Sequence, residues 1–184
     1  MLILVNKVFN MKFKLNEELA ELIGIILGDG NIYVSRKKGT YRVVISGHSV
    51  DDFNYLVSYV SMLIEKFSNK KPSLWKYKNK NAIAIALHSK QFVFFLISLG
   101  LKAGKKKLFV PPFIKEAPKK IKAAFLRGLA DTDFCVVLTK GGKYPVISGS
   151  TVSKKFAKEV VNLLNEFSIK SNIDVRRRKH TFSD

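Results

Sequence analysis

The sequence of 184 residues has one cysteine, few acidic residues and no long apolar run. A lone cysteine, Cys135, cannot form an intrachain disulfide and gives no cysteine metal cluster, which fits a reducing compartment. No apolar run approaches the ~20 residues needed to span a bilayer. The apolar residues before Asn6 are also too few for the ~7–15-residue core of a signal peptide. We therefore expect an intracellular, cytoplasmic protein without a membrane segment.

The shortage of acidic residues leaves a large excess of positive charge. There are 33 lysines and arginines against 14 aspartates and glutamates, so the formal net charge is +19 and the pI is near 10.0. Such an excess is typical of proteins that bind polyanions. Ribosomal, chromatin and membrane-surface proteins share it, so the charge favours nucleic acid as a partner without defining the activity. The length and the hydrophobic fraction of 47% suit one mid-sized domain or two small subdomains.

Two apolar segments end in an acidic residue at the point where a helix should end. They are LAELIGIILGDG, residues 19–30, and AAFLRGLADTDF, residues 123–134. Apolar residues in the first segment recur at helical spacing, which predicts a buried helix. An acid at a helix C-terminus is disfavoured by ~0.3–1 kcal/mol, because the helix dipole is negative there. Asp29 and Asp133 therefore each predict a positive group close by.

Each segment also carries small residues four apart on one face: Gly24 and Gly28, then Gly128 and Thr132. Such faces let two helices pack with their backbones nearly touching. In parallel packing Asp29 and Asp133 would meet at one end, and they would repel each other unless a cation lay between them. Mg²⁺ (or Mn²⁺) is the oxygen-preferring choice, and nucleases use metal-bound carboxylate pairs at phosphorus. Either motif alone is more often simple packing or a solvated acid, but their joint recurrence favours a shared site.

The pattern around these segments divides the chain into a first half, 1–107, a proline-containing linker, 108–118, and a second half, 119–184. The first half reads as helix, hairpin (31–48, turning at 37–40), helix (50–67), hairpin (73–87) and helix (91–99). The second half repeats the hairpin, turning at 140–143, then a helix (154–167) and a strand (169–178). Val-Ile-Ser-Gly recurs at 44–47 and 146–149. The second half stops before a fourth strand and a last helix.

The segments ELIGIILGDG and FLRGLADTDF resemble the two signature helices of the LAGLIDADG homing endonucleases, in the form where one chain carries both motifs. The stretches YRVVISGHSVDDF and GKKKLFVPPFI are also similar to that family. The resemblance implies an α+β fold of two pseudo-symmetric αββαββα halves, with antiparallel sheets forming a DNA-binding saddle. It implies a monomer that makes a site-specific double-strand break in DNA at a long recognition site, by Mg²⁺-dependent phosphodiester hydrolysis.

The same resemblance assigns roles to residues of the predicted site. Asp29 and Asp133 correspond to the acids that bind metal, with the backbone carbonyls of Gly28 and Thr132 as additional ligands. Lys106, in the run of lysines 105–107, matches a basic residue that stabilises the phosphate or polarises water; a solvated charge run is the competing interpretation. From charge and position, the candidate DNA-facing residues are Arg36, Lys37, Lys38, Arg42, Lys76, Lys78, Lys80, Lys140, Lys143, Arg176, Arg177 and Arg178.

Besides the short second half, two features depart from the family pattern. Phe134 stands where a glycine usually follows the second acid, which should change how that helix ends. Gly47 and Gly149 stand near strand positions where relatives carry a polar side chain, so His48 and Ser150 are the nearest substitutes. Trp75 and Tyr77 are predicted to be core residues rather than base-stacking platforms.

A second hypothesis is a nucleic-acid binder that does not cleave. It would be either an intron RNA-splicing maturase, with intron RNA as its partner, or a degenerate endonuclease that only binds DNA. The presence of both acids favours cleavage, whereas the short second half favours decay. Because no intein splicing residues flank the sequence, we expect a free-standing or intron-encoded protein.

Overall fold

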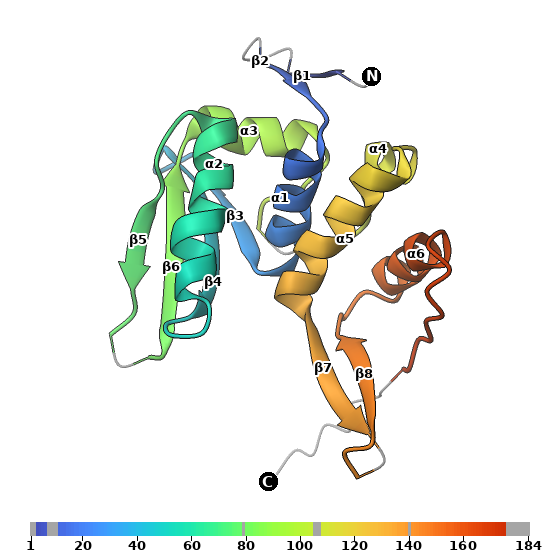
Figure 1. Cartoon of the computed structure of the whole chain (residues 1–184). Coiled ribbons are helices and arrows are strands. Elements are labelled where there is room, and N and C mark those ends of the chain that lie inside the picture. The colour runs from blue at the N-terminus through green and yellow to red at the C-terminus, as the bar shows by residue number, and fades with distance from the viewer. Residues whose placement is uncertain (1–2, 7–10, 79, 105–107, 140, 176–184) are drawn as a thin grey trace, which may run out of the picture.

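The computed structural model describes residues 3–6, 11–78, 80–104, 108–139 and 141–175. Two helices, α1 (Glu17–Gly28) and α5 (Lys119–Asp133), lie side by side at its centre. A sheet covered by helices lies on the α1 side, and a hairpin with one helix lies on the α5 side (Figure 1). This mixed arrangement of helices and antiparallel sheets confirms the predicted α+β class. None of the described helices is long and apolar enough to cross a membrane.

The first half forms an antiparallel sheet with the strand order β3-β4-β6-β5. Its strands are β3 (Gly30–Ser35), β4 (Thr40–His48), β5 (Ser73–Lys76) and β6 (Ala82–His88). Both predicted hairpins are therefore confirmed. Alternate residues of a strand point to opposite faces, and Val43 and Ile45 of β4 are fully buried on the face that the helices cover.

The predicted helix over residues 50–67 begins later than expected and starts in a different conformation. A π-helical segment, η1 (Tyr55–Val60), runs directly into α2 (Ser61–Ser68). The start is delayed because the Asp52 carboxylate accepts a hydrogen bond of 2.6 Å from the backbone N–H of His48 and closes a turn after β4. π-Helical turns occur often at functional sites, and this one lies beside the ends of α1 and α5.

The third helix of the first half has the expected end signals. Helix α3 (Lys90–Ser98) begins after Ser89, whose hydroxyl accepts from the N–H of Phe92 at 3.2 Å. It ends before Gly100, which has φ +95°, a conformation that glycine adopts without strain. A short helix, α4 (Pro112–Lys115), lies within the predicted linker and was not expected.

The second half has fewer strands than the sequence predicts. It contains β7 (Phe134–Thr139), β8 (Tyr144–Gly149) and α6 (Lys154–Asn165), which match the predicted hairpin and helix. The predicted strand at 169–178 is wrong over residues 169–175, and residues 176–178 lie outside the described part. In the first half the corresponding strand, β5, pairs only with β6. No counterpart of β6 occurs among the described residues, so 169–175 have no strand to pair with.

A further hairpin lies near the amino end and was not predicted. Strands β1 (Ile3–Asn6) and β2 (Met11–Lys14) pair antiparallel, with Ile3 opposite Lys14 and Asn6 opposite Met11. Helix α1 follows after Asn16, whose side chain accepts from the N–H of Leu19 at 2.9 Å. This N-cap fixes the point at which the central helix begins.

Candidate functional site

Helices α1 and α5 approach each other closely enough for backbone to touch backbone. A Cβ atom added to Gly24 would lie 2.8 Å from the backbone nitrogen of Leu129. A Cβ added to Gly128 would lie 2.9 Å from the carbonyl carbon of Glu21. Distances below 3.0 Å are essentially never seen for real Cβ atoms. Because Gly24 lies opposite residues near 128 and Gly28 lies opposite Thr132, the two helices run parallel and end together.

The two predicted acids stand at this common end. Asp29 caps α1 with its backbone N–H bonded to the carbonyl of Ile25 at 3.1 Å, and its side chain is exposed. Asp133 is the last residue of α5 and is half-buried. One carboxylate oxygen of Asp133 lies 3.5 Å from the Cβ position of Gly28, the residue before Asp29. The structure therefore brings the carboxylate of Asp133 to the chain segment that carries Asp29.

The Thr132 side chain fills the space that Gly28 leaves at the end of the interface. A Cβ on Gly28 would lie 2.7 Å from the Cβ of Thr132. The Thr132 hydroxyl donates to the carbonyls of Gly128 at 3.1 Å and Leu129 at 3.0 Å. A one-sided fit of this kind, glycine against threonine, keeps the two helix ends in contact without a second glycine.

A polar recess opens beside the helix ends and contains acids that the sequence did not single out. Its described lining is Asp29, Ile45, Ser46, Gly47, Asp52, Tyr55, Leu56, Asp131 and Thr132. Asp52 and Asp131 thus line the same recess as Asp29. The repeated acid in the second motif, Asp-Thr-Asp, was a signal for Asp131; nothing in the sequence pattern distinguished Asp52 or Tyr55.

Asp52 occupies the space next to Gly47. A Cβ on Gly47 would lie 2.9 Å from the Cβ of Asp52, so the glycine makes room for that side chain. The imidazole of His48 instead contacts the Asp51 carboxylate at 2.9 Å, and Ser150 is exposed. The polar group nearest Gly47 is therefore Asp52 rather than His48, which we had named as the substitute.

Tyr55 and Asp131 form the wall of the recess next to α5. The Tyr55 hydroxyl donates to a carboxylate oxygen of Asp131 at 3.4 Å. Burial raises the pKa of Tyr55 well above its ordinary range, and the negative charges of Asp131 and Glu21 add to the effect. Burial and the charge of Glu21 also raise the pKa of Asp131. Tyr55 consequently remains a protonated hydrogen-bond donor at neutral pH.

An ion pair between a buried glutamate and an exposed arginine joins the two central helices. Glu21 is only 1% exposed, and a carboxylate oxygen of Glu21 accepts a hydrogen bond from a terminal nitrogen of Arg127 across the helix interface. That hydrogen bond is the main reason why the pKa of Arg127 is raised. Burial and hydrogen bonding to Glu21 raise the pKa of Tyr59, whose ring centroid lies 5.8 Å from that of Tyr55. Glu21 and Arg127 thus form a charged contact between the two helices that precedes the helix ends carrying Asp29 and Asp133.

The recess has the chemistry of a site for a hard cation. Its donors are carboxylate and carbonyl oxygens, and the negative ends of two helix dipoles converge there. Neither α1 nor α5 has a basic residue in its last turn. Within the described residues no group of three or more histidine, cysteine, aspartate or glutamate side chains is placed to hold a metal by itself. Of the predicted ligands, Asp29 and Thr132 line the recess, and Asp133 lies next to Gly28 at the same helix end; their role in metal binding stays a prediction.

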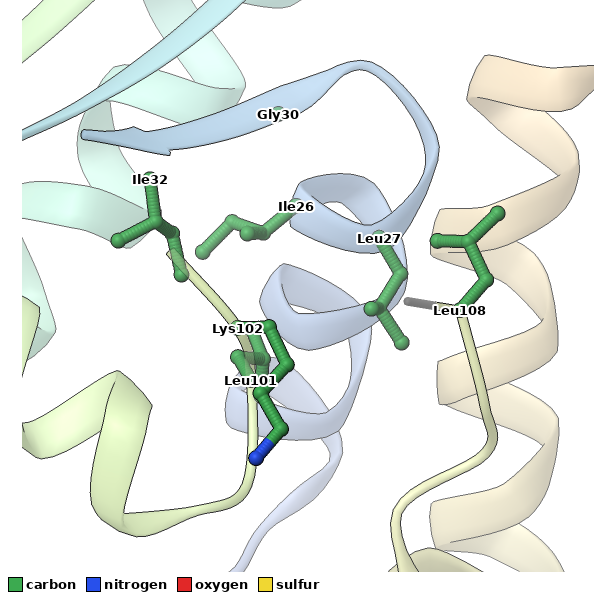
Figure 2. A pocket seen from close by; sticks show the side chains of 7 residues that line it. All are labelled: Ile26, Leu27, Gly30, Ile32, Leu101, Lys102 and Leu108. Atoms are coloured by element: carbon green, nitrogen blue, oxygen red, sulfur yellow. The ribbon is translucent and has the colours of Figure 1, made fainter. Parts of the chain in front are cut away.

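A second, apolar cleft lies on the other side of the end of α1, and Figure 2 shows its lining. The residues are Ile26, Leu27, Gly30, Ile32, Leu101, Lys102 and Leu108. The backbone N–H of Gly104 donates to the carbonyl of Ile32 at 3.0 Å, which ties the start of the linker to β3. The described residues on both sides of 105–107 thus lie near the end of α1. Lys106 itself lies outside the described residues.

The predicted DNA-facing residues are spread over the hairpins. Arg36, Lys37 and Lys38 are exposed in the β3–β4 turn; Lys76, Lys78 and Lys80 are exposed at the tip of the β5–β6 hairpin. Arg42 is half-buried on β4, and Lys143 is exposed at the β7–β8 tip. The remaining four, Lys140, Arg176, Arg177 and Arg178, lie outside the described residues. Trp75 and Tyr77 are not core residues: Tyr77 is 40% exposed and Trp75 is only half-buried.

Comparison with known proteins adds to this geometry. A family model described as a LAGLIDADG-like domain matches residues 120–183. The homing endonuclease I-DmoI, solved in complex with DNA and Mn, aligns with a TM-score of 0.66 and 21% sequence identity. The alignment covers 91% of this chain and 86% of that one. This likeness shows that the chain has the same fold.

Two curated proteins are similar in sequence over most of this chain. The replication factor C small subunit of Methanocaldococcus jannaschii is 30% identical over 86% of this chain and 9% of its own length. The replicative DNA helicase DnaB of Synechocystis sp. is 28% identical over 88% of this chain and 15% of its own length. The chain therefore spans only a small part of either relative.

Proposed function

We propose that this chain, a two-motif protein with the LAGLIDADG homing endonuclease fold, is a site-specific endonuclease that cuts both strands of duplex DNA. The observation that carries the proposal is the meeting of Asp29 and Asp133 at the common end of two parallel helices in backbone contact. Carboxylates and helix carboxyl ends that meet in this way are suited to bind a divalent cation, and the cation would in turn neutralise the negative charge of a scissile phosphate. Mg²⁺ is the proposed ion, with Mn²⁺ as a substitute.

The residues of the site have distinct proposed roles. Asp29 and Asp133 would hold divalent metal, with help from the carbonyls of Gly28 and Thr132. Bound metal would supply Lewis-acid stabilisation of the charge that develops at phosphorus. Tyr55, which stays protonated, donates its hydrogen bond to Asp131 and so orients that carboxylate in the recess, and Asp52 can accept a hydrogen bond from a water molecule there. Lys106 remains the proposed basic residue, because the described linker residues around it lie beside the end of α1.

The charge distribution supports duplex DNA as the substrate. Six exposed basic residues of the first half, Arg36, Lys37, Lys38, Lys76, Lys78 and Lys80, lie at the two hairpin tips of the four-stranded sheet. These tips lie at the margins of the sheet face that the helices leave open, where they can contact phosphates. I-DmoI, which has the same fold, was solved bound to DNA and Mn. The two curated relatives carry different names, and because the shared segment is a small part of each, neither activity is transferred. We propose that the protein acts as a monomer.

Cleavage is tested on a plasmid library with random 24-base-pair inserts, with Mg²⁺, Mn²⁺ or EDTA, followed by sequencing of the linear products. The unaltered protein is expected to cut a defined set of inserts only with metal. Asp29→Asn and Asp133→Asn should each lower the rate by at least about 100-fold while keeping DNA binding. Lys158→Ala, on the exposed side of α6, serves as the control. Cleavage that survives both aspartate substitutions would show that Asp29 and Asp133 do not form the active site.

One observation favours the alternative of binding without cleavage. The sheet of the second half has two strands among the described residues, against four in the first half. A smaller sheet offers less surface to position the second strand of DNA. Sequence-specific binding in EDTA, with no cleavage under either metal, would support a DNA binder of this kind; selective binding of structured intron RNA would support a maturase.

A further inference from the structure

The open face of the four-stranded sheet carries a cluster in which one arginine lies among aromatic side chains. Arg42 on β4 pairs with Tyr33 on β3 and with His88 on β6, so all three side chains lie on the same face. It is the face opposite Val43 and Ile45, which are buried beneath the helices. Trp75 on β5 reaches the same cluster, with its ring centroid 5.9 Å from that of His88.

The guanidinium of Arg42 lies against two aromatic rings. Its central carbon is 4.7 Å from the centroid of the Tyr33 ring and 5.3 Å from the centroid of the Trp75 ring. Both contacts are within the range of cation–π attraction. Within the described part of the chain no ion pair involves Arg42, so its charge is not neutralised by a carboxylate. The two rings therefore restrict the side chain while leaving its positive charge available.

One donor of Arg42 is already removed from solvent. The Nε atom is buried and has no hydrogen-bond partner within the protein. Burying an unpaired donor opposes folding, so this arrangement is not explained by stability. With Nε enclosed, the two terminal nitrogens remain as the parallel donors that an arginine can present to a ligand.

We propose that Arg42 is a base-reading residue that recognises a guanine in the major groove of the target duplex. Guanine presents two neighbouring acceptors there, O6 and N7, which match the spacing of the two terminal nitrogens of arginine. Stacking holds the guanidinium before DNA binds, so little side-chain freedom is lost on contact. The inference rests on the proposed function and adds to it one specificity-determining residue and the base it selects.

The other basic residues of this sheet lack such support. Lys38 and Lys76 are exposed, and no aromatic contact holds either ammonium group among the described residues. A flexible lysine near the margin of a sheet serves as a phosphate contact, which is insensitive to sequence. Lys76→Ala is therefore the matched control for Arg42→Ala. It removes one positive charge from the same sheet but leaves the stacked guanidinium of Arg42 in place.

The test is a selection of bound duplexes from a random 24-base-pair DNA pool in EDTA, so that cleavage does not interfere. The unaltered protein should select a motif that contains an essential G·C pair. Arg42→Ala should lose the preference at that pair alone, by roughly 10- to 100-fold, and keep the rest of the motif. Arg42→Lys retains the charge and should lower that preference by a smaller factor. Lys76→Ala should weaken all sequences equally and reduce the salt slope by about 0.9.

An internal reporter checks that the cluster exists and that each variant is folded. Trp75 is the single tryptophan of the chain, so its fluorescence reports on its contact with Arg42. Arg42→Ala and Arg42→Lys should both change the emission while the far-ultraviolet circular dichroism is unchanged. If Arg42→Ala does not fold, Arg42→Lys decides the outcome. An unchanged motif in the folded variants would overturn the role of Arg42 but leave DNA binding intact. Failure of the unaltered protein to bind any duplex would overturn this inference and the proposed function together.

Discussion

The pair Gly28 and Thr132 shows how single residues set the distance between the two central helices. A Cβ on Gly28 would meet a side chain, at 2.7 Å from the Cβ of Thr132, whereas a Cβ on Gly24 would meet the backbone of α5. A side chain can be shortened by a second substitution, but a backbone atom cannot. A second substitution should therefore rescue the stability lost on replacing Gly28, but not the stability lost on replacing Gly24.

We predict that Gly28→Ala lowers the free energy of unfolding by ~1–3 kcal/mol because of this overlap. Thr132→Gly removes the atoms that the new methyl group meets, so the double variant should recover at least ~1 kcal/mol relative to the sum of the two single changes. Urea unfolding of the four proteins measures this coupling. Gly24→Ala combined with Thr132→Gly should show no such recovery. Equal coupling for both glycines would mean that the helices do not pack as described.

Phe134 shows why part of the site could not be predicted from the sequence. It stands opposite Gly149 on the neighbouring strand, and a Cβ on Gly149 would lie 2.5 Å from the Phe134 ring. In the first half the sizes are reversed, with Gly30 opposite Ile45. The repeated Val-Ile-Ser-Gly suggests that Gly149 corresponds to Gly47, but the strand pairing makes it correspond to Ile45. A shift by two residues keeps every side chain on the same face of the strand. It therefore cannot be detected from the repeated sequence alone.

At the level of elements, the contact between α1 and α5 is asymmetric despite the repeat. Glu21 of α1 and Arg127 of α5 form an ion pair in which the glutamate is 1% exposed. The positions 104 residues away, Phe125 and Ile23, are both fully buried and apolar. One flank of the interface is therefore charged and the other is hydrophobic. This difference favours α1 with α5 over two copies of either helix.

Removing one member of this pair should be costly, whereas removing both should not. Arg127→Met leaves the Glu21 carboxylate buried without its partner and should lower the free energy of unfolding by ~2–4 kcal/mol. The double variant Glu21→Met with Arg127→Met should lie within ~1 kcal/mol of the unaltered protein. Chemical denaturation at pH 7 measures both values. A double variant that is less stable than Arg127→Met alone would show that the charges themselves stabilise the interface.

One carboxylate of helix α6 bonds to two residues of the linker. Glu159 accepts hydrogen bonds from the backbone N–H of Val110 at 2.8 Å and from the Lys115 ammonium at 2.7 Å. Burial alone would raise the pKa of Glu159, but these hydrogen bonds and the positive charges of Lys115 and Lys155 outweigh burial and lower it. The ionised form of Glu159 is thus the one that these contacts stabilise.

These contacts should depend on pH in a definite direction. A carboxyl group with a lowered pKa in the folded state adds stability above its unfolded pKa, ~4.3, and loses it as the pH falls through the folded pKa. Glu159→Gln should therefore cost ~1–3 kcal/mol at pH 7 and less at pH 3. Urea unfolding at the two pH values, with Lys158→Ala as the control, measures the difference. A cost that is the same at both pH values would exclude ionisation as its source.

Most of the helices and strands could be predicted from the sequence, because the signals for them are local. Helical spacing placed α1, α3 and α6, and turn residues placed three of the hairpins. What failed depends on distant partners. The strand expected at 169–178 needs a neighbour that is not among the described residues, and η1 depends on Asp52 closing the turn after β4. Likewise, the approach of Asp52 and Tyr55 to Asp29 follows from packing that no spacing rule contains.

At the scale of the whole molecule, the two halves differ in how much of the apolar surface of their sheets is buried. The strands of the β7–β8 hairpin contain no charged residue in a chain of net charge +19. Even so, most of their large apolar side chains are exposed, including Val136 at 69% and Ile147 at 72%. In the first half, helices cover the corresponding face of the sheet. The two halves thus share a sequence pattern but not the burial that usually accompanies it.

Ile45 and Ile147 make this difference measurable. Ile45 is fully buried, and Ile147 corresponds either to Ile45 by its sequence repeat or to Val43 by strand pairing, both of which are fully buried. Ile45→Ala should cost ~2–5 kcal/mol of unfolding free energy, whereas Ile147→Ala should change it by less than ~0.5 kcal/mol. Urea unfolding of the two variants at several protein concentrations gives both values. A large cost at Ile147 would show that the hairpin is covered in solution, and a cost that grows with protein concentration would identify a second copy of the chain as the cover.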